Sequence, residues 1–178
     1  MIEALISSKT RIKLLLKFFL NSDSTSYLRG LESEFGESTN SIRIELNRFE
    51  EAGMLKSFLK GNKKYFQANT DHPLFGEVHN ILLKYLGFDT IIDEVINRLG
   101  DVRKVYVVGE FAKGLDSNII DLVFVGEVNK EYLIKLIDKV ENLISRKVRY
   151  ITYTETEYAA ASIDSNQAKP LLLWSDEG

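Results

Sequence analysis

The sequence predicts an α+β protein built from two modules. Helical periodicities and a hairpin signal occupy the first half, whereas the second half combines helices with strands rich in β-branched residues. The charge divides in the same way, because residues 1–87 carry a net +2 and residues 88–178 a net −5. Such asymmetry suggests modules with different partners. We expect a first domain at 1–72, linker helices at 73–99 and a second domain at 100–178.

The composition is that of an ordinary folded protein. The chain has 178 residues, of which 44% are hydrophobic and 28% charged, and it has no cysteine. Disulfides and thiolate metal sites are therefore excluded. The apolar stretch Leu14–Leu20 is interrupted by Lys17 and is too short to span a membrane. We expect a cytoplasmic protein without a membrane partner.

Three helices are predicted at the start of the chain. The first has apolar residues at the spacing i, i+3, i+4, i+7, namely Ile12, Leu15, Leu16 and Phe19. A polar break at 21–26 precedes a short second helix, about 27–35, that ends at Gly36. The third opens with Ser38 and Thr39 as cap candidates and stops at Gly53. Its apolar face consists of Ile42, Leu46 and Phe49.

A β-hairpin is predicted directly after these helices. In "LKSFLKGNKKYFQAN", two short apolar runs flank the dipeptide Gly61-Asn62, which is a two-residue turn signal. Three helices followed by a hairpin are the element order of a winged helix-turn-helix.

Double-stranded DNA is the predicted partner of this first module. A recognition helix reads base edges with short polar side chains, Arg and Asn, and we assign this role to Thr39, Asn40, Ser41, Arg43 and Asn47. Lysines at the hairpin tip are expected to neutralise phosphates, namely Lys60, Lys63 and Lys64. Glu45, Glu50 and Glu51 count against this assignment, since acids near the groove repel phosphate. The alternative is a winged helix that binds protein.

Two segments carry a family resemblance. "FEEAGML" resembles the end of helix three in MarR/ArsR-like winged-helix regulators. "GNKKYFQANTDHPLFGEVHNILLKYLG" is similar to the wing and linker of a prokaryotic family that joins a winged helix to a nucleotidyltransferase-like domain. The resemblance covers about residues 10–158. It implies a transcriptional regulator with a second, nucleotidyltransferase-like domain.

A linker helix follows the hairpin. Pro73 suits its first position, Asp71 is a candidate cap, and Gly87 ends it. Its apolar stripe is Phe75, Val78, Leu82, Tyr85 and Leu86, which is expected to pack on the winged helix or on a second subunit. We predict a homodimer with this helix at or near the interface. The histidines, His72 and His79, lack acidic neighbours at ligand spacing and are expected to be structural.

The second module predicts a domain of helices and strands. A helix with Ile92, Val95, Ile96 and Leu99 ends at Gly100. Strands follow at "RKVYVVG", "IIDLVFVG" and "KVRYITY", with "PLLLW" as a candidate fourth. A long amphipathic helix precedes the third strand and buries Leu133, Leu136, Ile137, Val140 and Ile144.

The loop between the first two strands resembles the nucleotidyltransferase signature, a Gly-Ser-x-Ala-Arg-Gly run followed by an Asp-x-Asp strand. Ala112, Lys113 and Gly114 fit that run after Gly109, and Asp121 matches the second aspartate. Glu110, however, replaces the serine that would grip phosphate. The position of the first aspartate is Ile119.

These departures predict a vestigial nucleotide pocket, formed by Gly109, Glu110, Lys113, Gly114 and Asp121. Mg²⁺ requires several oxygen ligands, usually two or more carboxylates. We therefore predict no catalytic residue, no metal and no cofactor. A bulge between Ile119 and Ile120 is the alternative, because it would bring Asn118 or Asp116 into the pocket. Lys113 is expected to be engaged by Glu110 and Asp121.

The sequence as a whole predicts a DNA-binding transcriptional regulator. The second domain then serves effector binding, with a small neutral or cationic molecule as the ligand, or dimerisation. One alternative is an active nucleotidyltransferase that uses the winged helix to hold its substrate. The other is an interaction protein that binds neither DNA nor nucleotide.

Overall fold

The computed structural model describes residues 6–161 and 169–177, which fall into two compact units divided between Tyr85 and Leu86. Helices and strands occur in both units, so the predicted α+β class is confirmed. The division falls inside the region for which linker helices were predicted.

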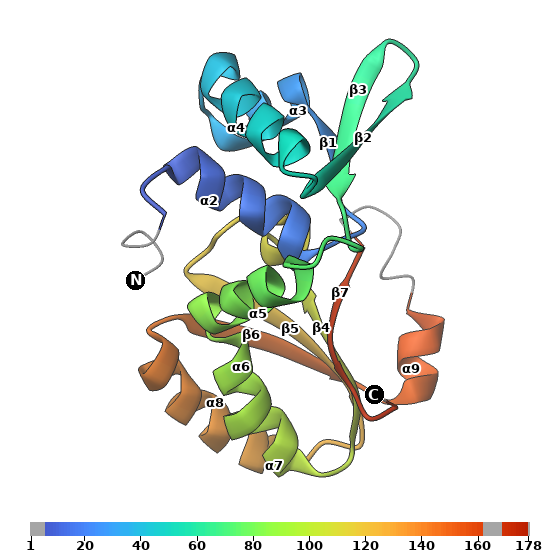
Figure 1. Ribbon diagram of the computed structural model, residues 1–178. Coiled ribbons are helices and arrows are strands. Elements are labelled where there is room, and N and C mark those ends of the chain that lie inside the picture. The colour runs from blue at the N-terminus through green and yellow to red at the C-terminus, as the bar shows by residue number, and fades with distance from the viewer. Residues whose placement is uncertain (1–5, 162–168, 178) are drawn as a thin grey trace. The chain divides into compact units, whose positions relative to one another are not determined.

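From residue 6 onward, the N-terminal unit contains four α-helices and a three-stranded antiparallel sheet (Figure 1). Its helices are α2 (Lys9–Leu15), which continues into the π-helical turn η1 (Leu16–Leu20), α3 (Leu28–Phe35), α4 (Thr39–Glu51) and α5 (Phe75–Leu86). Its strands are β1 (Thr25–Tyr27), β2 (Leu55–Lys60) and β3 (Lys63–Ala68), in the order β1-β3-β2. Strand β1 covers the end of the predicted polar break, 21–26, and Tyr27, where the second helix was predicted to begin. Its three residues pair with Tyr65–Gln67 of β3, which supplies the hydrogen bonds that so short a strand cannot obtain locally.

The core of this unit is the apolar face predicted for the first and third helices. Ile12, Leu15, Leu16 and Phe19 are all less than one tenth exposed, as are Ile42, Leu46 and Phe49. The hairpin turn also forms where it was predicted, with Gly61 at φ 62°. Only glycine adopts this angle without strain at the first central position of such a turn.

The start of α5 differs from the prediction. The helix begins at Phe75, and Pro73 lies in the preceding turn. His72 organises this turn, because its carbonyl accepts from the Phe75 amide and its Nδ1 accepts from the Leu74 amide. Asp71 does not cap the helix but forms an ion pair with Lys56 at 2.7 Å. At the other end, Leu82 and Leu86 of the predicted stripe are fully buried.

The C-terminal unit contains a four-stranded mixed sheet in the order β6-β5-β4-β7. Its strands are β4 (Val102–Val108), β5 (Ile119–Gly126), β6 (Lys147–Tyr153) and β7 (Leu171–Ser175), and β5 is antiparallel to β4 but parallel to β6. The connection from β5 to β6 passes through α8 (Lys130–Ile144), as a parallel pair requires.

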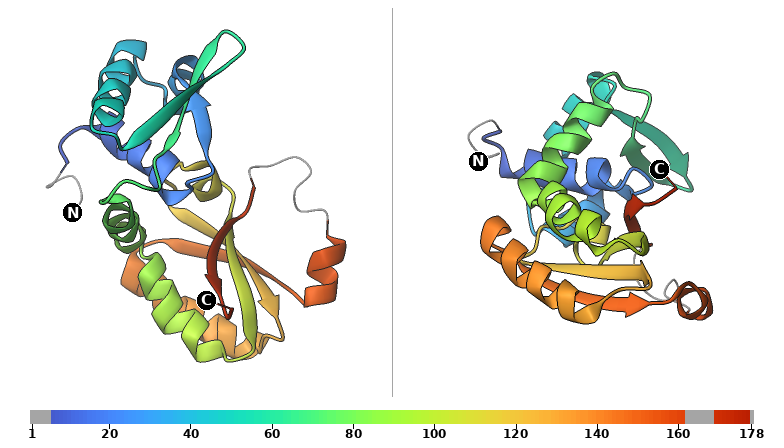
Figure 2. Two further views of the ribbon diagram at one scale, coloured as in Figure 1. Left: turned by 45° about the vertical axis from the view of Figure 1, so that its right-hand side comes forward. Right: turned by 90° about the horizontal axis from the view of Figure 1, so that it is seen from below.

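Helices cover this sheet unevenly. The segment α6 (Phe88–Ile91), η2 (Ile92–Ile96) and α7 (Asn97–Leu99) lies beside α8 along the sheet (Figure 2). The predicted faces of these helices form the core with the sheet, and Leu133, Val140 and Val95 are fully buried. A helix that was not predicted, α9 (Glu155–Ala160), contacts β5 and β6.

Candidate functional site

Helix α4 presents a polar face to solvent because its start is capped and its apolar side is buried. Ser38 caps the helix, since its Oγ accepts from the Ser41 amide at 3.2 Å. Ile42 and Leu46 are buried, which leaves the opposite side to solvent. The residues predicted to read DNA that are exposed there are Asn40, Ser41, Arg43 and Asn47, with Thr39 half-buried.

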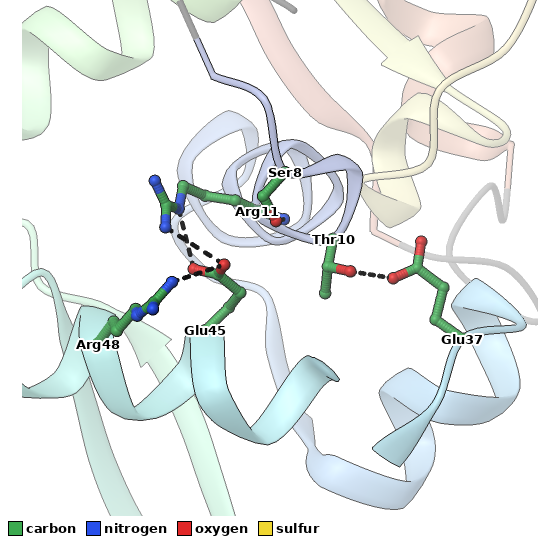
Figure 3. Close-up of polar contacts among 6 residues, drawn as sticks. All are labelled: Ser8, Thr10, Arg11, Glu37, Glu45 and Arg48. Atoms are coloured by element: carbon green, nitrogen blue, oxygen red, sulfur yellow. Dashed lines mark hydrogen bonds and ion pairs between the residues drawn. The ribbon is translucent and has the colours of Figure 1, made fainter. Parts of the chain in front are cut away.

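An ion pair between a buried carboxylate and a partly exposed arginine anchors α4 to α2. The Glu45 carboxylate is almost fully buried and accepts from Arg11 Nε at 2.9 Å and from Arg11 Nη2 at 3.2 Å (Figure 3). Arg48 donates a third hydrogen bond at 3.2 Å. Burial alone raises the pKa of the Glu45 carboxyl, but the hydrogen bonds and charge of Arg11 outweigh it and lower the pKa. Glu45 therefore presents no free acid to a ligand, contrary to the objection drawn from the sequence.

A second contact fixes the turn between α3 and α4. The Thr10 hydroxyl donates to the Glu37 carboxylate (Figure 3). The same carboxylate pairs with Lys13 at 2.7 Å. Burial opposes ionisation of Glu37, and the hydrogen bonds from Lys13 and Thr10 overcome it, so its pKa is lowered. The turn before α4 is thus tied to α2 by ionised groups.

The three wing lysines have different surroundings. The cation of Lys63 lies over the Tyr27 ring, 4.2 Å from its centroid. Lys64 donates to Glu50 at 2.7 Å, and Ser57 donates to the same carboxylate. These two hydrogen bonds, that from Lys64 first, lower the pKa of Glu50. Lys60 is exposed next to the turn and has no salt bridge within the described part of the chain.

A cavity of about 550 Å³ lies between α4, the start of α3 and the hairpin. It is called the wing cavity here, and its lining residues are Tyr27, Leu28, Arg29, Arg43, Leu46, Asn47, Asn62, Lys63, Lys64 and Phe66. Four of the residues predicted to contact DNA meet there, namely Arg43, Asn47, Lys63 and Lys64. Thr39, Asn40, Ser41 and Lys60 do not line it.

Arg29 is a cation of the wing cavity that was not predicted from the sequence. It is exposed in the first turn of α3 and lines the wing cavity. In the sequence it lies outside both predicted groups, which are on α4 and on the hairpin. The sequence offered one indication of this role: Arg29 is a basic residue at the start of the helix that precedes α4. Only folding of β1 onto β3 brings this turn to the hairpin.

The glycine loop of the C-terminal unit has a defined shape. Gly109 and Gly114 have left-handed backbones and enclose a short 3₁₀ turn, η3 (Phe111–Lys113). A Cβ atom at Gly109 would lie 2.6 Å from Oδ2 of Asp121, so glycine is required for the loop to pass this carboxylate. Lys113 pairs with Glu110 at 2.8 Å, as expected.

Asp121 is engaged by a residue other than the one expected. Its Oδ1 accepts from Arg149 Nε at 2.6 Å and its Oδ2 from Arg149 Nη2 at 2.9 Å. The two residues are register partners on the parallel strands β5 and β6. The hydrogen bonds with Asp121 raise the pKa of the Arg149 guanidinium. Both carboxylate oxygens thus already serve a bidentate pair.

The proposed rescue of the metal site does not occur. Ile119 and Ile120 pair with consecutive residues of β6, Lys147 and Val148, so no bulge lies between them. Asp116 instead forms an ion pair with Arg146 at 2.7 Å. Within residues 6–161 and 169–177, no three acidic or histidine side chains are grouped as a metal would require.

The histidines have local partners. His79 Nδ1 lies 2.7 Å from the carbonyl oxygen of Phe19, and its ring stacks on Phe75. His72 organises the turn before α5. Both contacts lie inside the N-terminal unit.

No family model matches this chain, and no curated protein sequence matches it. Solved structures that match part of this chain include the protein AF1382 from Archaeoglobus fulgidus, with 18% identity and a TM-score of 0.37, over 52% of this chain and 94% of that one. A chain from the complex of a tri-AMPylated HEPN toxin with an MNT antitoxin of Shewanella oneidensis is 14% identical, with a TM-score of 0.37, over 52% and 72%. A putative nucleotidyltransferase from Sulfolobus solfataricus is 26% identical, with a TM-score of 0.35, over 53% and 84%.

In the described parts of the chain, no helix has the length and apolar character needed to cross a bilayer.

Proposed function

We propose that the chain is a DNA-binding transcriptional regulator whose N-terminal unit acts as a winged helix-turn-helix. Helix α4 is the recognition helix and the β2–β3 hairpin is the wing. The observation that carries the proposal is the joint placement of Arg43 and Asn47 on the exposed side of α4 with Lys63 of the hairpin around the wing cavity. Arg and Asn have the donors and acceptors that base edges require, and Lys neutralises phosphate.

Two details of charge support DNA over a basic or neutral protein partner. Two of the three acids named against DNA binding are engaged, because Glu45 is held by Arg11 and Glu50 by Lys64. Among the described residues that line the wing cavity, none is acidic. The surface that meets the ligand is therefore cationic although the whole chain carries −3.

For the C-terminal unit we propose a role without nucleotide transfer. Asp121 is the one residue that matches the catalytic aspartates, and Arg149 holds both of its oxygens. Effector binding or dimerisation is the function left to this unit. The proposed protein is a homodimeric regulator whose activity depends on binding of a small neutral or cationic effector.

The test of DNA binding is a gel-shift series with purified protein and duplex DNA from its own locus. Binding at low salt that weakens steeply as salt is added supports the proposal, since the steepness counts phosphate contacts. Absence of a shift at low salt on every duplex from that locus overturns it. A winged helix that binds protein gives this second outcome.

A further inference from the structure

We propose that the wing cavity binds one phosphate of the DNA backbone, held jointly by Arg29, Arg43 and Lys63. The inference rests on the proposed function and names the part of the DNA that this cavity takes. It also adds Arg29, from outside the recognition helix and the wing, to the binding surface.

The first argument is the state of the three cations. Arg29 lies on α3, Arg43 on α4 and Lys63 on β3, so three separate elements direct positive charge to one concavity. Within the described part of the chain, neither arginine makes a salt bridge or a side-chain hydrogen bond. Lys63 contacts the Tyr27 ring, which is uncharged and leaves the positive charge uncompensated. Three uncompensated cations around one cavity predict an anionic ligand.

The second argument separates Lys64 from this group. Its ammonium is paired with Glu50, whose carboxylate also accepts from Ser57 of β2. A phosphate would have to displace that carboxylate to gain Lys64. The phosphate is therefore assigned to the other three cations, and Lys64 is assigned to holding the hairpin against α4.

The third argument is the rest of the lining. Leu28, Leu46 and Phe66 give the cavity an apolar wall, and Asn47 and Asn62 add neutral amides. A phosphodiester has this mixed character, because a charged group is flanked by apolar deoxyribose rings. Arginine suits the charged part, since its planar fork donates two parallel hydrogen bonds to phosphate oxygens.

The experiment is a methylphosphonate scan of a short duplex from the locus, chosen by gel shift. Each duplex has one backbone phosphate replaced by its neutral methyl analogue, and the affinity of the wild-type protein is measured. The same duplexes are then measured with Arg29→Gln and with Lys63→Gln. The matched controls are Arg29→Lys, which keeps the charge, and Lys84→Gln, which removes an exposed charge of α5 that does not line the cavity.

We expect the wild-type protein to lose affinity at several phosphates of each bound site. Both Gln variants should respond less than wild type at one and the same phosphate, and should keep the wild-type response at the others. Loss of one contact lowers the log–log salt slope by about 0.9, so the affinity lost between 50 and 200 mM salt is roughly threefold smaller than for wild type. Lys84→Gln should keep the wild-type response. Arg29→Lys should remain sensitive at that phosphate, because it keeps the charge, but with lower overall affinity, because it loses the planar fork. If wild type binds DNA and Arg29→Gln keeps its full response at every phosphate, the phosphate site is wrong and the regulator proposal stands. If wild type binds no DNA, both proposals fall.

Discussion

The carboxylate of Asp121 and the guanidinium of Arg149 form a bidentate pair, with N–O distances of 2.6 and 2.9 Å. They face each other because β5 and β6 are parallel and these residues are in register. A divalent metal at Asp121 would therefore compete with a charge that is already in place. Glu110 adds a second obstacle, since it places a carboxylate in the loop that would hold phosphate oxygens.

From this relationship we predict that no nucleotide binds in a Mg²⁺-dependent manner. Polyphosphate needs Mg²⁺ to offset its charge, and Mg²⁺ needs more oxygen ligands than Asp121 supplies. The measurement is calorimetry with ATP, CTP, GTP and UTP, each with Mg²⁺, together with a radiolabel-transfer assay. Micromolar, Mg²⁺-dependent nucleotide binding that disappears in Asp121→Ala would show that this site binds nucleotide, and would contradict the prediction.

A set of gain-of-function variants is the control for that prediction. Glu110→Ser with Ile119→Asp restores the missing groups of the signature, and Ile119 shares a strand face with Asp121. We expect this double variant to bind Mg²⁺ weakly or not at all while Arg149 holds Asp121. Adding Arg149→Ser should then produce measurable Mg²⁺ affinity by calorimetry.

The second prediction separates base reading from phosphate contact. Asn47→Ala should relax sequence preference, since one well-formed bidentate base contact contributes about 1–3 kcal/mol of discrimination. Lys60→Gln should instead weaken binding equally on operator and unrelated duplexes and lower the salt slope by about 0.9. Competition gel shifts with the two duplexes measure both effects. Equal losses on both duplexes for Asn47→Ala would remove α4 from the role of recognition helix.

The third prediction concerns Glu50, which binds Lys64 and Ser57. Glu50→Gln removes the charge that neutralises Lys64 and should make the salt slope steeper by about 0.9, with tighter binding to unrelated DNA. Sequence preference should fall, because the hairpin loses its tie to α4. Glu51→Gln is the matched control, as Glu51 is exposed one residue further along. Equal effects of the two variants would indicate general repulsion of DNA and no specific role for Glu50.

The elements that the sequence predicted well are those whose ends are marked locally. Helix α4 runs from Thr39 to Glu51, between the Ser38 cap and the glycine at position 53. The hairpin turn lies at Gly61-Asn62 for the same reason, since a two-residue turn has a strong local preference. Helix α9 was missed although Thr154 and Glu157 form a capping box, which is also a local signal.

The features that the sequence did not predict depend on pairing between distant segments. Strand β1 exists because β3 offers it an edge, and three residues are too few for a periodic pattern. Arg29 reaches the wing cavity through that same pairing. Arg149 was seen only as a strand residue, because the register of two parallel strands cannot be read from either strand alone. The sequence therefore predicted which types of residue form the candidate site, but not which side chains contact one another there.

The fourth prediction concerns stability. Glu45→Ala should lower the free energy of unfolding by about 2 kcal/mol, because it removes a buried carboxylate that accepts from Arg11 and Arg48 and leaves Arg11 without this partner. Urea denaturation measures the loss, with the exposed Glu51→Ala as control. A loss equal to that of the control would show that the ion pair contributes nothing.

The pH dependence of that loss follows from the lowered pKa of Glu45. A depressed carboxyl pKa stabilises the fold fully above the unfolded value of about 4.3, and this contribution disappears as the pH falls through the lower folded value. The difference in stability between wild type and Glu45→Gln should thus be constant near neutral pH and shrink in acid. A difference that grows in acid would contradict the assignment.

The last prediction is that the protein is a homodimer and that the solvent side of α5 contributes to its interface. The stripe predicted for this role is already used, since Phe75 stacks on Phe19 and His79, and Leu82 is fully buried. Two large apolar side chains remain exposed, Ile81 of α5 at 49% and Leu74, in the turn directly before this helix, at 54%. Ile81→Glu should shift the protein towards monomer in light scattering over a range of concentrations, because a carboxylate in an apolar contact is costly. Ile134→Glu on α8, which is 50% exposed, is the matched control and should leave the assembly unchanged. A concentration-independent species of 20.3 kDa for the wild type would contradict the dimer, and a dimer insensitive to Ile81→Glu would move its interface away from α5.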